Sequence, residues 1–72
     1  MPNDLIQVVS SNIEAVGFNE ATNTLTVRFH TGKVYEYSGV AREYFEQMLN
    51  SESVGQYFHQ RIRSNFECRR KE

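Results

Sequence analysis

The clearest pattern in the chain is an alternation of apolar and polar side chains, with Leu25, Val27 and Phe29 at every second position. Such alternation predicts a β-strand with one buried face. A second short strand, Val34-Tyr35-Glu36-Tyr37, follows after a connection that contains Gly32. The two segments are therefore predicted to form an antiparallel hairpin.

Two turns fit this connection, and they place the tyrosines on opposite faces of the sheet. A two-residue Thr31-Gly32 turn pairs Arg28 with Tyr35 and exposes both tyrosine rings. A three-residue loop with Gly32 in the left-handed conformation pairs Val27 with Tyr35 and buries both rings. We favour the second register, because the burial of two aromatic rings is the larger free-energy term.

A third strand is predicted over residues 13–18, before the hairpin. Its alternation slips between Ile13 and Val16, and a β-bulge there puts Ile13, Val16 and Phe18 on one face. Residues 5–9 form a short apolar stretch, which either pairs as an N-terminal edge strand or lies across the core.

After the strands the apolar spacing changes to that of helices. One stripe comprises Val40, Tyr44, Phe45, Met48 and Leu49, and a second comprises Val54, Tyr57, Phe58 and Ile62. Ser53 is a suitable N-cap for the second helix. Gly55 in its first turn costs about 1 kcal/mol of helix propensity, which is tolerated more readily if another group approaches the backbone there.

These elements predict an α+β fold: a three-stranded antiparallel sheet, with a short N-terminal edge strand as an option, followed by two helices packed on one face. Seventy-two residues make a single domain, 1–72, with a core over about 8–66. Phe66 is expected to dock as a final core aromatic, and residues 67–72 to form a flexible basic tail.

The charges are unevenly distributed along the chain. Residues 1–52 carry three basic and seven acidic side chains, whereas residues 53–72 carry five basic and two acidic ones. The basic side chains of this second part are Arg61, Arg63, Arg69, Arg70 and Lys71. They are the candidate nucleic-acid-binding residues, because cations that contact phosphates release counterions. The alternative interpretation is a solvated tail.

The residues that resemble a known family are spread over most of the chain. The most specific are the Tyr35-Glu36-Tyr37 triplet and Ser53-Val54-Gly55-Gln56-Tyr57-Phe58, followed by Ile62-Arg63. Further matching positions are Ser10-Ser11, Ile13, Val16-Gly17-Phe18-Asn19, Leu25-Thr26-Val27-Arg28-Phe29 and Gly32. Together they resemble the KTSC domain, a small bacterial and phage module also found at the C-terminus of some lysyl-tRNA synthetases. Ala41 stands where the family often has proline.

The resemblance implies a fold and no enzyme activity, and its synthetase context suggests RNA as a ligand. Five of the matching residues, Tyr35, Tyr37, Ser53, Gly55 and Phe58, are interpreted as structural. The tyrosines are alternatively a platform on which bases stack, but packing is favoured. Three roles are open for Arg63: a contact with a phosphate, a hydrogen bond to a tyrosine hydroxyl, or stabilisation of the helix C-terminus by its charge.

No catalytic set of residues is visible in the sequence. His30 and His59 have no second ligand at metal-binding spacing, so neither a metal nor another cofactor is expected. Cys68 is the single cysteine, and with no transmembrane segment or signal peptide it favours a cytoplasmic protein. We therefore expect a non-catalytic RNA-binding module. The alternative is a protein-interaction or self-association domain that uses a sheet edge or an apolar patch.

Overall fold

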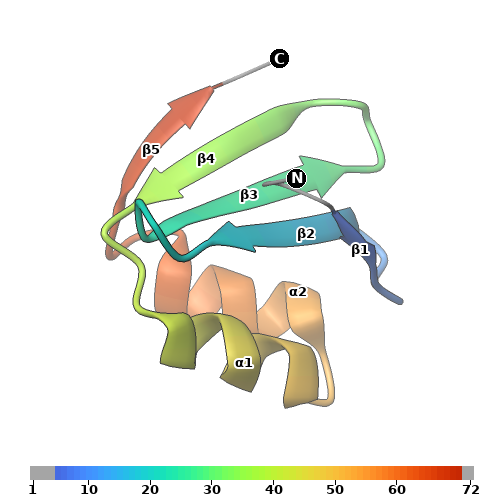
Figure 1. Cartoon of the computed structure of the whole chain (residues 1–72). Helices are drawn as coiled ribbons and strands as arrows, with labels where there is room; N and C mark the ends of the chain where they lie inside the picture. Colours follow the sequence, from blue (N-terminus) through green and yellow to red (C-terminus); the bar gives the residue numbers. More distant parts are fainter. Residues whose placement is uncertain (1–4, 71–72) are drawn as a thin grey trace.

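The computed structural model describes residues 5–70, which fold into one antiparallel sheet with helices on one face (Figure 1). The strands are β1 (Ile6–Gln7), β2 (Ile13–Asn19), β3 (Thr24–Phe29), β4 (Val34–Ser38) and β5 (Glu67–Arg70), in that order across the sheet. Helix α1 (Arg42–Asn50) is followed by α2 (Val54–Tyr57), which continues into the π-helical segment η1 (Phe58–Ile62).

The hairpin β3–β4 has the register that buries the tyrosines. Val27 lies opposite Tyr35, and Leu25 lies opposite Tyr37. The loop between the strands contains Gly32 at φ = +93°, a backbone conformation that residues with a Cβ rarely adopt. The predicted three-residue loop is therefore confirmed.

Strand β2 contains the predicted bulge. Its register against β3 shifts between Ile13 and Ala15, so that Ile13 and Val16 both face the helices and are fully buried. Phe18, also on this face, stacks against Phe45 of α1 with 5.5 Å between ring centroids. The bulge thus lets β2 present an unbroken apolar face to the core.

Both predicted helices are present, and their apolar stripes pack on the sheet. Val40, just before α1, and Met48, within α1, are buried. Along α2 and η1 the buried residues are Val54, Phe58 and Ile62. These side chains form one core cluster with those of β2, β3 and β4. Ser53 caps α2 as predicted, because its side chain accepts a hydrogen bond from the Gln56 backbone N–H at 3.3 Å.

The prediction of a three-stranded sheet was wrong, because the described residues form five strands. The N-terminal edge strand exists as the two-residue β1, which pairs with β2. Residues 67–70, which we had assigned to a tail, pair with β4 as β5. Their side chains are all exposed, so no alternation of apolar and polar residues marked this strand in the sequence.

Phe66 docks as predicted and helps to bring β5 to the sheet. Its half-buried ring packs edge-on against Tyr44 of α1, with 5.3 Å between centroids. The chain thereby returns from η1 to the edge of β4. Among the described residues no helix is long and apolar enough to cross a membrane.

Candidate functional site

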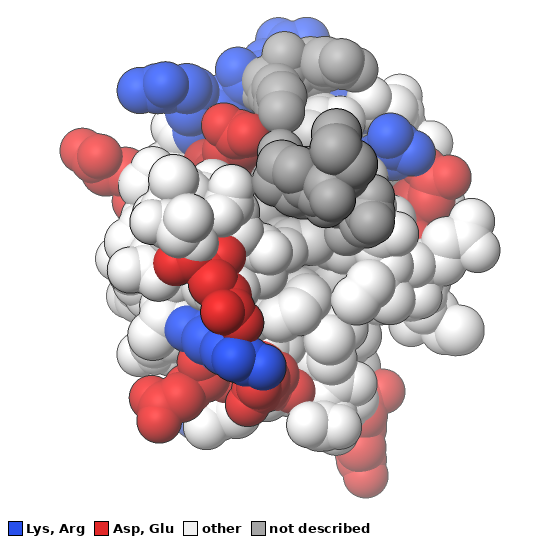
Figure 2. Space-filling model, in the orientation of Figure 1, with Lys and Arg blue, Asp and Glu red and all other residues white. Residues whose placement is uncertain are grey.

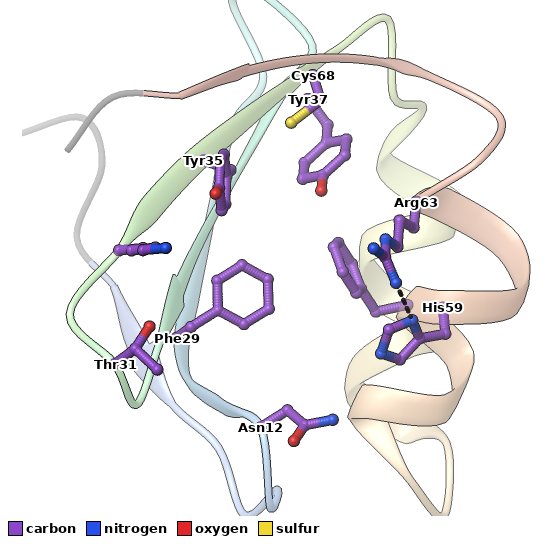
Figure 3. A pocket seen from close by; sticks show the side chains of 10 residues that line it. Asn12, Phe29, Thr31, Tyr35, Tyr37, His59, Arg63 and Cys68 are labelled. Carbon is purple, nitrogen blue, oxygen red and sulfur yellow. Dashed lines mark hydrogen bonds between the residues drawn. The ribbon is translucent and has the colours of Figure 1, made fainter.

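A pocket of about 480 Å³ opens between the β3–β4 hairpin and the second helix (Figure 3). We call it the aromatic pocket, and its lining consists of Asn12, Phe29, Thr31, Lys33, Tyr35, Tyr37, Phe58, His59, Arg63 and Cys68. The hairpin supplies one wall, η1 supplies the opposite wall, and β5 contributes Cys68. The pocket therefore joins segments that are far apart in the sequence.

Four aromatic rings form the apolar part of the pocket. Phe58 lies edge-on to both Phe29 and Tyr37, with centroid distances of 5.8 and 5.2 Å. Phe29 in turn lies edge-on to Tyr35, at 5.6 Å. Tyr37 and Phe58 are 4% and 1% exposed and form the floor, whereas Phe29 and Tyr35 are only half-buried. The last two rings therefore keep part of their surface accessible in the pocket lining.

The helical wall owes its geometry to the π-helical turn. The Arg63 backbone N–H donates to the Phe58 carbonyl at 2.9 Å, a hydrogen bond that spans five residues. Such turns are rare and often occur at functional sites. Here His59 and Arg63 lie side by side on the pocket wall, and the Arg63 guanidinium donates to His59 Nδ1 at 3.2 Å.

The electrostatics of the aromatic pocket favour an anion. Its described lining includes Lys33 and Arg63 but neither aspartate nor glutamate. The hydrogen-bond partner of the Arg63 guanidinium is an imidazole nitrogen rather than a carboxylate, so this bond leaves the positive charge of Arg63 uncompensated. Within residues 5–70 neither Lys33 nor Arg63 forms a salt bridge. The pocket thus contains two cations without a compensating carboxylate in its wall.

Tyr37 contributes a neutral phenol to the floor of the pocket. Burial raises the pKa of its hydroxyl well above the usual range, and the neighbouring Cys68 thiol raises it further. The nearby Arg63 guanidinium opposes this effect and lowers the pKa. Tyr37 therefore keeps its proton at physiological pH.

The structure separates the basic residues that the sequence had grouped together. Arg63 lines the aromatic pocket, and Arg70 lies opposite Tyr35, on the face of the sheet that bears the pocket. Arg69 lies opposite Glu36, and alternation along the strands puts this pair on the other face. Arg61 lines a separate hollow beside Glu43 of α1. Lys71 lies outside the described residues.

Three of the five residues interpreted as structural line the aromatic pocket. Tyr37 and Phe58 are buried, and Tyr35 is half-buried between the hairpin and the helices. Ser53 caps α2, and Gly55 lies against Ser10, which explains the glycine in a helix. Packing and pocket formation are therefore combined at Tyr35, Tyr37 and Phe58.

Sequence reasoning missed Asn12, Lys33 and His59 as neighbours in one pocket. Lys33 follows a turn glycine and lies in residues 1–52, where acidic side chains outnumber basic ones. Asn12 belongs to a turn-like segment. Their spacing carries no recognisable motif, so only the fold reveals that they converge. Among the described residues no group of three metal-ligating side chains is present.

The surface charge also differs between the two ends of the molecule. Figure 2 shows Lys and Arg at the top of the view, where β5 lies in Figure 1, and many acidic side chains over the lower part, where α1 lies. The positive charge of Arg42 in α1 is compensated, because its guanidinium forms salt bridges with Glu20 at 2.7 Å and with Glu46 at 2.9 Å. Positive charge of the described residues is therefore concentrated near β5, and negative charge near α1.

Comparison with known proteins agrees with the family resemblance. The family model of the KTSC domain matches residues 9–66, which include all buried core residues and the lining of the aromatic pocket except Cys68. The chain belongs to the KTSC domain family. The crystal structure of a KTSC domain protein from Yersinia pestis superimposes with a TM-score of 0.92 at 26% identity, covering 96% of this chain and 97% of that chain.

Relatives of two kinds contain a similar sequence. A lysine–tRNA ligase of a Nostoc species is 39% identical over 62 residues, which are 86% of this chain but only 11% of the ligase. This KTSC domain thus spans a small part of the ligases that it matches. A protein of Tsukamurella paurometabola is 37% identical over 59 residues, 82% of this chain and 88% of that protein.

Proposed function

We propose that this KTSC domain is a non-catalytic module that binds RNA at the aromatic pocket and the adjoining end of β5. The observation that carries the proposal is the combination of accessible aromatic rings with uncompensated cations in one pocket. Phe29 and Tyr35 offer stacking surfaces, and Lys33, Arg63 and Arg70 offer charges for phosphates. Proteins that bind single-stranded nucleic acid combine these two features.

RNA is favoured over DNA by the context in which similar domains occur. The ligase of the Nostoc species is named for a tRNA substrate, and a segment similar to this chain makes up 11% of its length. Sequence-tolerant stacking together with phosphate contacts suits the unpaired bases of RNA loops and ends. This context supports RNA as the partner of the present chain.

The proposal includes binding only, because the polar groups of the pocket suit a binding role. The Nδ1 atom of His59 already accepts the Arg63 hydrogen bond, so this nitrogen is not available as a base. Tyr37 keeps its proton, since burial raises the pKa of its hydroxyl. These two groups therefore suit hydrogen-bond contacts with a bound RNA.

Fluorescence anisotropy with labelled RNA tests the proposal directly. A hairpin RNA with an unpaired loop, a single-stranded RNA and a duplex DNA are titrated at low and at physiological salt. We expect micromolar binding to the two RNAs that weakens as salt rises. Each phosphate contact with single-stranded RNA contributes about 0.7 to the slope of log Kd against log salt.

Variants identify the cations that make these contacts. Arg63→Gln, Lys33→Gln and Arg70→Gln should each weaken RNA binding and lower the salt slope. Arg42→Gln is the matched control, because Arg42 is paired with Glu20 and Glu46 on the helical layer. Absence of RNA binding at low salt, or equal losses in the Arg42 variant and the pocket variants, would refute the proposal.

A second candidate function is association with a protein or with a second copy of the chain. Val9 is 99% exposed and Ile6 is 48% exposed, and both line a shallow apolar hollow with Leu49 and Val54. The outer edges of β1 and β5 are further sites where another strand can pair. Light scattering after size-exclusion chromatography measures the mass of the particle in solution, with Val9→Ser as the test variant. A mass that rises with protein concentration, and that is lower in the variant, supports association.

A further inference from the structure

We propose that the aromatic pocket holds one unpaired nucleotide, with its base against Phe29 and Tyr35 and its phosphate between Lys33 and Arg63. This inference rests on the proposed function and names the part of the RNA that the pocket recognises. The volume of about 480 Å³ falls within the range of about 300–1,000 Å³ that is common for small-ligand pockets. One nucleotide is a ligand of this class.

The aromatic rings divide into a floor and an accessible wall. Tyr37 and Phe58 are buried and pack edge-on at 5.2 Å, so their positions are fixed by the core. Phe29 and Tyr35 are half-buried and line the pocket with part of their surface exposed. A base that enters covers the apolar surface that these two rings leave exposed. Stacking on one aromatic ring strengthens binding by about 5- to 140-fold.

Asn12 is placed to contact the edge of the base. Its backbone is held on both sides, because the N–H donates to Ser10 Oγ and the carbonyl accepts from the His30 N–H at 3.0 Å. Its side-chain amide borders the pocket, at the end opposite Tyr37 in Figure 3. An amide offers both donors and an acceptor, and the edge of a nucleobase requires both.

The two cations lie on opposite walls of the opening. Lys33 belongs to the β3–β4 connection, and Arg63 lies at the end of η1. Arg63 donates a hydrogen bond to His59 Nδ1, a ring nitrogen rather than a carboxylate, so this contact orients the guanidinium without cancelling its charge. A phosphate attached to the base is therefore attracted from two sides. No carboxylate belongs to the described lining that would repel it.

Binding of mononucleotides, measured by NMR with ¹⁵N-labelled protein, tests the inference. AMP, GMP, CMP and UMP are titrated separately, with ribose 5-phosphate and inorganic phosphate as probes that lack a base. We expect the nucleotides to shift the backbone resonances of Asn12, Lys33 and His59, and the probes without a base to bind at least tenfold more weakly. Equal binding of ribose 5-phosphate overturns the inference, because the pocket would then recognise a phosphate alone.

Variants of the accessible rings complete the test. Phe29→Leu and Tyr35→Leu keep an apolar side chain and remove the stacking surface, and each should weaken nucleotide binding about 5-fold or more. Tyr44→Leu is the matched control, because Tyr44 is also half-buried but packs on Phe66, away from the pocket. A native-like spectrum of each variant shows that it remains folded. Equal affinities in all three variants overturn the inference.

The same variants separate this inference from the proposed function. If hairpin RNA binds with salt-dependent affinity but the ring variants bind it as tightly as the wild type, RNA binding stands and the nucleotide pocket is overturned. If mononucleotides bind in the pocket but neither RNA binds, the pocket is supported with a free nucleotide as its ligand, and the RNA-binding function is refuted. A loop nucleotide replaced by 2-aminopurine should lose fluorescence on binding, because its base stacks on one of the two rings.

Discussion

A Cβ atom placed on Gly55 would lie 2.8 Å from the hydroxyl oxygen of Ser10. The two residues belong to the start of α2 and to the turn before β2, so the helix and this turn approach each other closely here. Ser10 Oγ is not free to move aside without loss, since it accepts hydrogen bonds from the Asn12 and Ile13 backbone N–H groups, both at 3.3 Å. The glycine is therefore required by packing at this position.

Gly55→Ala should lower the free energy of unfolding by about 1–3 kcal/mol, because the added methyl group overpacks this contact. In a Ser10→Ala background the same substitution should cost less or become stabilising, since alanine has about 1 kcal/mol more helix propensity than glycine. Urea unfolding of the four proteins gives the coupling energy. A coupling energy of zero would mean that the contact with Ser10 does not limit position 55.

Gly32→Ala should destabilise the protein by about 1–2 kcal/mol, because residue 32 has φ = +93° and residues with a Cβ are strained there. Apart from residue 32 and its two chain neighbours, nothing lies within 4 Å of the added Cβ, so the expected loss comes from the backbone conformation. The comparison is Thr31→Ala in the same exposed turn, which should change stability by less than about 0.5 kcal/mol. Thermal and urea unfolding measure both variants, and equal stabilities would contradict the strain argument.

Removal of residues 67–72 should lower the free energy of unfolding by about 1–3 kcal/mol. The deletion takes away the four residue pairs between β4 and β5, and each cross-strand pair contributes about 0.2–1 kcal/mol. Removal of residues 71 and 72 alone leaves β5 whole and serves as the control. If the longer deletion were as stable as the shorter one, β5 would contribute nothing to the fold.

Tyr37 should make the stability fall at alkaline pH. Its pKa is raised in the folded state, whereas in the unfolded chain it is about 10. Below that pH both states keep the proton, and above it only the unfolded chain loses the proton, so the free energy of unfolding falls by up to about 1.4 kcal/mol per pH unit. Tyr37→Phe should show a smaller fall between pH 9 and pH 11 in urea unfolding. Parallel pH profiles of the two proteins would contradict this assignment.

Only part of the sheet was predictable from the sequence. The register of β3 and β4 was predictable, because Gly32 restricts the loop and the burial of Tyr35 and Tyr37 selects one pairing. The bulge in β2 was predictable from the slip in its alternation. β5 was not, because Glu67, Cys68, Arg69 and Arg70 are all exposed and form no periodic pattern. Its pairing with β4 depends on the path of the chain after η1.

The candidate site was predictable only in part. Arg63 and Arg70 were named from the charge of the C-terminal segment, and the structure puts both on the face that bears the pocket. Arg61 and Arg69 carry the same charge in the same segment, yet they face a different hollow and the other side of the sheet. Charge along the chain therefore identified the residue type but not the surface on which each residue lies.

The sequence by itself determined the strands β2 to β4, the two helices, their apolar faces and the family. These features depend on local periodicity, on glycine conformation and on short motifs, and each of these signals comes from residues that are close together in the sequence. Only the tertiary structure decided that Asn12, Lys33, His59 and Arg63 surround one aromatic pocket. Each of these side chains is polar, and the sequence around it does not indicate which other residues it will lie near. The packing of η1 against the hairpin brings them together.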